Sequence, residues 1–177
     1  INIDFIFKDL EKFYVERINI FGNYITEEKV IRNSLIVDEG DAYNDILFDK
    51  SIDAIKSKRI FKSVKSEVKN SEIDNQFKII NIFVEEKPTG EIFAGAGTGT
   101  SGASLTAGIT ENNYLGKGIK LSTNLTVAED EIKGKFSVVN PNFNNSDRSL
   151  NTTIESTTSD FLSTGGFRTS RTGFGIG

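Results

Sequence analysis

Two clusters in this chain combine residue types that can do chemistry. Asp38, Glu39 and Asp41 could together hold a cation, but they lack the spaced oxygen ligands of an EF-hand loop. The run Gly95-x-Gly97-x-Gly99 has the glycines of a phosphate-binding loop, but a dinucleotide fingerprint is spaced differently and opens a helix. We therefore interpret the acidic cluster as a solvated loop, and we expect no metal site and no cofactor.

The composition excludes most enzyme classes. The chain contains no His and no Cys, which removes Ser-His-Asp triads, cysteine nucleophiles, and zinc sites built on imidazole or thiolate. Its formal net charge of −4 argues against a nucleic-acid-binding domain, where a basic patch is expected. We expect a protein that is not an enzyme and does not bind nucleic acid.

The first half of the chain predicts a small α+β domain. Residues 1–10 read as a short strand that belongs to a preceding unit, and residues 13–21 form the next strand. Thr26 is a good N-cap for a first helix, because acidic residues follow it where the helix dipole favours negative charge.

A second helix and two strands complete this domain. Asn44 or Asp45 can cap a helix that runs to about residue 58 and has Phe48, Ile52 and Ile55 on one face. Strands are predicted near 62–69 and at 77–84. The order is β-α-α-β-β, and its roughly 75 residues suffice for one modest core.

From Gly90 onward, short strands alternate apolar and polar residues. Leu105, Ala107 and Ile109 alternate with polar or small residues, and Leu121, Leu125 and Val127 repeat this pattern. We predict about six strands, at 91–99, 103–111, 118–128, 131–140, 148–157 and 166–177.

This alternation fits two architectures equally well, a membrane β-barrel and a soluble β-sandwich. A spacing of about ten residues plus turns is what a membrane barrel strand needs. The residues after Thr89 are too few to close even an eight-stranded membrane barrel. Either the chain continues beyond Gly177 or it is a sandwich. No run approaches the 18 apolar residues of a transmembrane helix.

Five segments together resemble the BamA family, the bacterial outer-membrane β-barrel assembly factors. YVERINIFGN (14–23) and RIFKSV (59–64) resemble parts of that family's last POTRA (polypeptide-transport-associated) domain, and VEEKPTGEIFAGAG (84–97) resembles its join to the first barrel strand. TENNYLGKG (110–118) and NPNF (140–143) resemble two periplasmic turns of the family. The residues that carry these two turn motifs are Asn113, Tyr114, Leu115, Gly116, Gly118, Pro141 and Phe143.

The resemblance implies an α+β POTRA domain followed by antiparallel transmembrane β-barrel strands that form a partial barrel. Residues 1–11 would end a preceding POTRA repeat, 12–88 would be the last POTRA domain, and 89–177 would be the first barrel strands. It also implies a location in the bacterial outer membrane, with the POTRA part in the periplasm.

The resemblance further implies that the first barrel strand is one side of a lateral gate. There, an incoming barrel precursor would pair by β-augmentation, which needs an edge whose backbone groups are released at low cost. The alternative is that its glycines only relieve crowding at a barrel bend. The gate residues are Ile92, Phe93, Ala94, Gly95, Ala96, Gly97, Thr98 and Gly99.

Arg32 and Glu39 fall where the family's last POTRA domain contacts a partner lipoprotein. The alternative for both is a solvated helix face and an acidic turn. The strand at 62–69 is an expected sheet edge to which a peptide could add, although its lysines are also a common protection against aggregation.

The function implied by the resemblance is assembly and insertion of outer-membrane β-barrel proteins. The expected partners are assembly lipoproteins, unfolded outer-membrane proteins and the lipid bilayer. A transporter of the two-partner secretion type shares the POTRA and barrel parts and remains open. A soluble periplasmic binding module with a β-sandwich is the alternative from another class.

Overall fold

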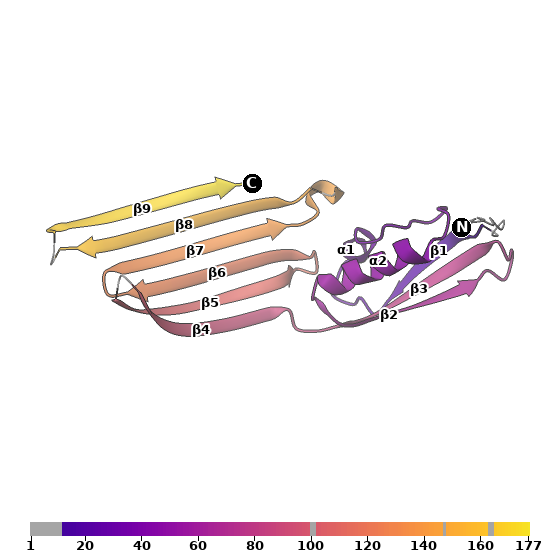
Figure 1. Cartoon of the computed structure of the whole chain (residues 1–177), viewed down its shortest axis with the longest axis horizontal. Coiled ribbons are helices and arrows are strands. Elements are labelled where there is room, and N and C mark those ends of the chain that lie inside the picture. Colours follow the sequence, from indigo (N-terminus) through magenta and orange to yellow (C-terminus); the bar gives the residue numbers. More distant parts are fainter. Residues whose placement is uncertain (1–11, 100–101, 147, 163–164) are drawn as a thin grey trace, which may run out of the picture.

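The computed structural model describes residues 12–99, 102–146, 148–162 and 165–177. These residues form a three-stranded sheet and a six-stranded sheet. Figure 1 shows them end to end, with the helices on one face of the smaller sheet. We call residues 12–88 the N-terminal domain. The strand predicted within residues 1–10 lies outside the described residues.

The N-terminal domain has the predicted order β-α-α-β-β. Its elements are β1 (Tyr14–Phe21), α1 (Glu28–Arg32), α2 (Asp45–Ser57), β2 (Phe61–Asn70) and β3 (Phe77–Glu86). The sheet order is β1-β3-β2, with β1 parallel and β2 antiparallel to β3. The strand predicted at 62–69 is therefore an edge strand, as expected.

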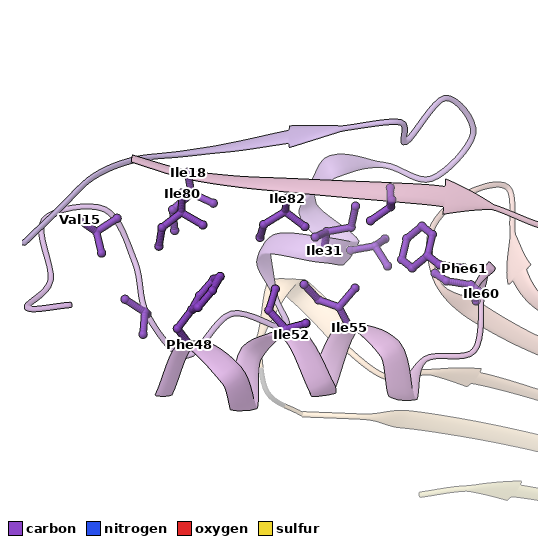
Figure 2. Close-up of a cluster of buried hydrophobic side chains, with 13 residues drawn as sticks. Val15, Ile18, Ile31, Phe48, Ile52, Ile55, Ile60, Phe61, Ile80 and Ile82 are labelled. Atoms are coloured by element: carbon purple, nitrogen blue, oxygen red, sulfur yellow. The ribbon is translucent and has the colours of Figure 1, made fainter. Parts of the chain in front are cut away.

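The core of this domain lies between α2 and the sheet. Asn44 caps α2, because its side-chain oxygen accepts a hydrogen bond from the Leu47 N–H at 3.1 Å. The predicted stripe of Phe48, Ile52 and Ile55 is buried. Figure 2 shows these side chains pointing from the helix toward the isoleucines of the strands. Burying this stripe supplies the packing that a helix of 13 residues needs.

The prediction that Thr26 caps the first helix is wrong. Helix α1 begins at Glu28, the residue in the N-cap position is Glu27, and no side chain makes the capping hydrogen bond. Thr26 is instead 2% exposed, and its side chain bonds a residue of the six-stranded sheet. The sequence has the pattern of a helix cap, but the Thr26 hydroxyl accepts a hydrogen bond from the distant side chain of Asn113 instead.

The second sheet has the six predicted strands in consecutive antiparallel order. They are β4 (Gly90–Gly99), β5 (Gly102–Tyr114), β6 (Ile119–Ala128), β7 (Glu131–Asn140), β8 (Leu150–Phe161) and β9 (Phe167–Ile176). Two boundaries differ from the prediction by three residues or more. Residues 112–114 belong to the end of β5 rather than to the turn, and β8 extends to Phe161 through a run of Ser and Thr that has no apolar alternation.

The two faces of this sheet differ in character. Direct pairing places Leu105 opposite Val127 and Ala107 opposite Leu125, so these residues share one face, which we call the apolar face. Lys133 and Glu155 lie on the other, polar face and form an ion pair at 3.1 Å. No other part of the described chain covers most of the apolar face: the side chain of Leu125, for example, remains 51% exposed. A sandwich would bury this face against a second sheet, so the described strands support the barrel interpretation.

The apolar face changes along its cross-strand rows. One row of paired positions runs through Leu105, Val127 and Ile132, and then reaches Thr158 and Ser170. At this end of the sheet, hydroxyl groups form hydrogen bonds between β8 and β9. The side-chain oxygens of Thr158 and Ser170 are 3.3 Å apart, and so are those of Ser156 and Thr172. The apolar surface thus ends sooner on β8 and β9 than on β5 to β7.

Candidate functional site

Strand β4, which contains all eight predicted gate residues, lies at one edge of the six-stranded sheet. It pairs with β5 without interruption, from Gly90 opposite Glu111 to Gly99 opposite Gly102. Every residue of β4 is exposed. Its second edge has no strand partner among the described residues, and no proline interrupts the strand. The backbone groups on that edge can therefore pair with an added strand.

The three glycines of β4 leave open space on the polar face. A Cβ atom built on Gly95 or Gly99 would meet no atom within 4 Å, and one on Gly97 would meet only the Ser104 hydroxyl at 3.7 Å. In the described sheet, these glycines do not relieve crowding. What they remove is cross-strand side-chain contact, which weakens the pairing of the outer half of β4 with β5.

Phe93 anchors the other half of the strand. Its ring covers Gly108 on β5, where an added Cβ would lie 2.5 Å from the ring. Phe93 and Gly108 are directly paired across the strands. An aromatic ring over a cross-strand glycine fixes register. The first half of β4 is thus held to β5 by the contact of Phe93 with Gly108. The second half, which contains the three glycines, pairs with β5 mainly through backbone hydrogen bonds.

Segment 24–27 of the N-terminal domain is clamped by the carboxylate of Glu86 at the end of β3. The N–H groups of Tyr24, Ile25 and Thr26 donate to this carboxylate at 3.0, 2.9 and 2.6 Å. Burial acts against the charged form, but the hydrogen bonds from the Thr26 side chain and these backbone groups outweigh it. The pKa of Glu86 is therefore held below its ordinary value.

The same segment contacts the turn between β5 and β6. The Asn113 amide donates to the Thr26 hydroxyl at 2.9 Å, and the Glu27 N–H donates to the Gly116 carbonyl at 2.8 Å. Gly116 has φ +72°, and a Cβ there would lie 2.0 Å from the Ile25 carbonyl oxygen. The turn motif therefore packs against the N-terminal domain, and glycine is required for its close approach. We call these contacts the joint.

Two further residues of the joint come from the linker and from β5. Glu111 accepts hydrogen bonds from the Thr89 hydroxyl and from the Asn113 N–H. The Asn113 side-chain oxygen accepts from the Gly118 N–H at 2.8 Å, so the side chain that reaches Thr26 is itself fixed. The linker that leads into β4 is thereby tied to the same turn.

The structure brings Arg32 and Glu39 together at the outer edge of β1. Arg32 Nη1 and Glu39 Oε1 are 3.5 Å apart. Arg32 Nη2 donates to the Ile18 carbonyl at 3.0 Å, and Glu39 Oε1 accepts from the Ile18 N–H at 2.9 Å. The carboxylates of Glu28 and Glu39 offset burial and raise the pKa of Arg32. Both side chains remain partly exposed and cover backbone groups of an edge strand.

The remaining predicted turn residues lie at the same end of the sheet. Leu115 has φ +54° in the turn after β5 and is exposed. The Phe143 N–H donates to the Arg148 carbonyl at 2.8 Å, which closes the loop that follows Pro141. Both turns thus lie on the side that faces the N-terminal domain (Figure 1).

The acidic cluster is held within its own loop. Asp41 accepts from the Asp38 N–H, and Asp38 accepts from the Glu39 N–H. Among the described residues, no group of three or more acidic side chains could hold a metal ion. In the same part of the chain, every helix is too short or too polar to cross a membrane.

Sequence reasoning missed two contacts of this site. The pair Phe93–Gly108 was not predicted, although an aromatic residue in a glycine-rich strand is a usable signal. The hydrogen bond between Asn113 and Thr26 joins residues 87 positions apart in the sequence, and no local sequence pattern predicts it.

Comparison with known proteins gives matches to both parts of the chain. The family model POTRA, described as "Surface antigen variable number repeat", matches residues 13–87. The "Outer membrane protein assembly factor BamA" of Buchnera aphidicola is 29% identical over 116 residues, which are 65% of this chain and 19% of that protein. A "Putative outer membrane protein assembly factor" of Treponema pallidum is 33% identical over 127 residues, 68% of this chain and 15% of that protein.

A solved structure matches across both sheets. The crystal structure of BamA from Haemophilus ducreyi lacking POTRA domains 1–3 superimposes with a TM-score of 0.76 at 26% identity. The match covers 83% of this chain and 28% of that one. The chain spans less than a fifth of the length of the two curated relatives.

Proposed function

Because this chain belongs to the BamA-like family of outer-membrane proteins, we propose that it assembles and inserts β-barrel proteins into the bacterial outer membrane. The six-stranded sheet lies in that membrane, and the N-terminal domain is periplasmic. Insertion needs no covalent step. The driving force is the pairing of backbone polar groups, which hydrocarbon cannot satisfy.

The observation that carries this proposal is the composition of β4, an outer strand of the described sheet whose outer half faces β5 mostly with glycines. An assembly factor needs a strand that can release one neighbour and accept another. Gly95, Gly97 and Gly99 give weak side-chain pairing, and the unbroken backbone offers a ladder to an added strand. We propose that Ile92–Gly99 is the lateral gate and that a strand of an unfolded outer-membrane protein pairs with it.

The test is site-specific crosslinking in cells that make the full-length protein. Cysteines placed singly in Ile92–Gly99 should form disulfides with cysteines in the terminal strand of an arriving barrel precursor. A cysteine at Thr106, on the inner strand β5, is the matched control and should give none. Crosslinks from Thr106 as strong as those from β4 would contradict pairing at this edge.

A second arm tests strand exchange itself. A disulfide that locks β4 to the last strand of the same barrel should block assembly while the barrel stays folded, and reduction should restore assembly. Normal assembly with the lock fully formed would rule out exchange at this seam.

We also propose that Arg32 and Glu39 contribute to the surface that contacts a periplasmic assembly lipoprotein. Both side chains are partly exposed, at 37% and 42%, and they present opposite charges side by side. Their hydrogen bonds to Ile18 fix the pair on a rigid strand, which favours a defined partner geometry.

A further inference from the structure

A cleft of about 680 Å³ lies between the N-terminal domain and the polar face of the six-stranded sheet. Its domain side is formed by the end of α2 and the corner that follows. Its sheet side is formed by the first residues of β4 and β6, by the end of β5, and by Val139 and Pro141 at the end of β7. The residues that matter for the argument are Lys58, Arg59, Lys87, Glu91 and Lys120.

Four of these five residues are cations, in a chain whose net charge is −4. None of the four forms an ion pair among the described residues. Glu91 is the single carboxylate lining the cleft. The cleft therefore concentrates positive charge that the surrounding protein leaves uncompensated, and such a concave charged surface attracts anions.

Local structure at the end of α2 defines where two of the cations leave the backbone. Lys58 is more than half buried, and that burial lowers its pKa. Arg59 has φ +59°, a conformation that non-glycine residues rarely adopt and that persists where the surrounding structure imposes it. Its N–H bonds the Lys56 carbonyl at 3.1 Å, which closes the end of α2. The residues that follow α2 therefore place two cations, Lys58 and Arg59, in the lining of the cleft.

The position of the cleft indicates which anion it meets. Glu91 pairs with Thr110 and Lys120 pairs with Val139, and all four lie on the polar face. The lipid bilayer contacts the opposite, apolar face. Lipid headgroups on the apolar side would therefore not reach the cleft, whereas a polypeptide that approaches β4 on the polar side could reach it. Glu91 is also the second residue of β4.

We propose that this cleft binds a carboxylate-bearing segment of the polypeptide whose neighbouring strand pairs with β4. Lys87, Lys120 and Arg59 supply exposed charges, and Lys58 supplies a partly buried one. The inference rests on the proposed function, because it takes the anion to be carried by a polypeptide in transit.

The test uses the purified full-length protein and two synthetic peptides that differ only in having three aspartates or three asparagines. The aspartate peptide should bind more tightly, and added salt should weaken it. Lys87→Ala and Lys120→Ala should each weaken its binding about two- to fivefold, as expected for partly screened charges. Both side chains are exposed, so folding is preserved. Lys135→Ala removes an exposed lysine of the polar face outside the cleft and is the matched control.

Equal binding of the two peptides, or equal weakening by Lys135→Ala, would overturn the proposal. Full displacement of the peptide by inorganic phosphate at the same charge concentration would also overturn it, because the site would then select a small anion. Crosslinking at β4 separates the two hypotheses. If crosslinks form but the cleft variants bind normally, only the cleft assignment fails; if crosslinks are absent, the proposed function fails first.

Discussion

At the scale of single residues, charged side chains here satisfy backbone groups that lie at element edges. Glu86 binds three N–H groups of segment 24–27, and Glu39 binds the Ile18 N–H beside Arg32. A charge-assisted hydrogen bond of this kind is worth more than a surface ion pair. The sequence predicts Glu39 as a partner contact, with a solvated loop charge as the alternative, and the structure also gives it a specific acceptor role.

This double role shapes the prediction for the lipoprotein surface. Glu39→Lys should weaken recruitment of the lipoprotein, because it reverses the charge beside Arg32. It should also cost about 1–3 kcal/mol in stability, since the Ile18 N–H loses its acceptor. Glu39→Gln keeps an acceptor oxygen and should fold normally while recruiting less partner. Co-purification and urea unfolding of the same variants measure the two effects, and unchanged co-purification of Glu39→Lys would contradict the assignment.

At the scale of elements, the alternation along each strand decides which side contacts lipid. Leu125 and Asn124 are neighbours on β6 and point to opposite faces, so they form a matched pair. Leu125→Arg should cost about 2–4 kcal/mol near the bilayer midplane, and Asn124→Arg should be tolerated. Ile109→Arg and Thr106→Arg on β5 repeat the comparison. Urea unfolding of the full-length protein in lipid vesicles gives the values, and equal loss on both faces would indicate a buried core instead.

Local patterns predicted the elements well because local physics produces them. Asn44 capped α2, and Phe48, Ile52 and Ile55 formed its buried face, since both features depend on residues within a few turns. Thr26 failed as a cap for the opposite reason: its partner Asn113 lies in another sheet. The sequence did not predict the cleft either, because its four cations come from three separated segments, at 58–59, 87 and 120.

At the scale of the whole molecule, the joint determines how the two sheets are held together. Thr26 and Asn113 are 2% and 7% exposed, so their hydrogen bond is shielded from water. The clamp at Glu86 and the close approach of Gly116 act on the same segment. The N-terminal domain and the turn after β5 therefore form one continuous contact, in addition to the covalent linker.

Gly116→Ala should separate the two parts. Its Cβ would lie 2.0 Å from the Ile25 carbonyl oxygen, so the turn must move away from segment 24–27. Gly134→Ala is the matched control, because a Cβ at that position meets no atom within 4 Å. Spin labels at Lys50 on α2 and Ser170 on β9 report the distance between the parts. A broader or shifted distance distribution is expected for Gly116→Ala alone, and an unchanged one would show that the joint does not set the orientation.

The uneven apolar face has a geometric consequence for how the sheet crosses the bilayer. Directly paired residues form rows perpendicular to the strands, yet one such row changes from Leu105 and Val127 to the hydroxyls of Thr158 and Ser170. If the strands were parallel to the membrane normal, every residue of such a row would lie at the same depth in the bilayer. A row that is apolar at one end and polar at the other therefore indicates strands that are inclined to the membrane normal. At the usual inclination of about 35–45°, each strand step climbs about 3 Å. With that inclination, Thr158 and Ser170 should lie closer to the hydrocarbon boundary than Leu105 and Val127 do, on the side away from the N-terminal domain.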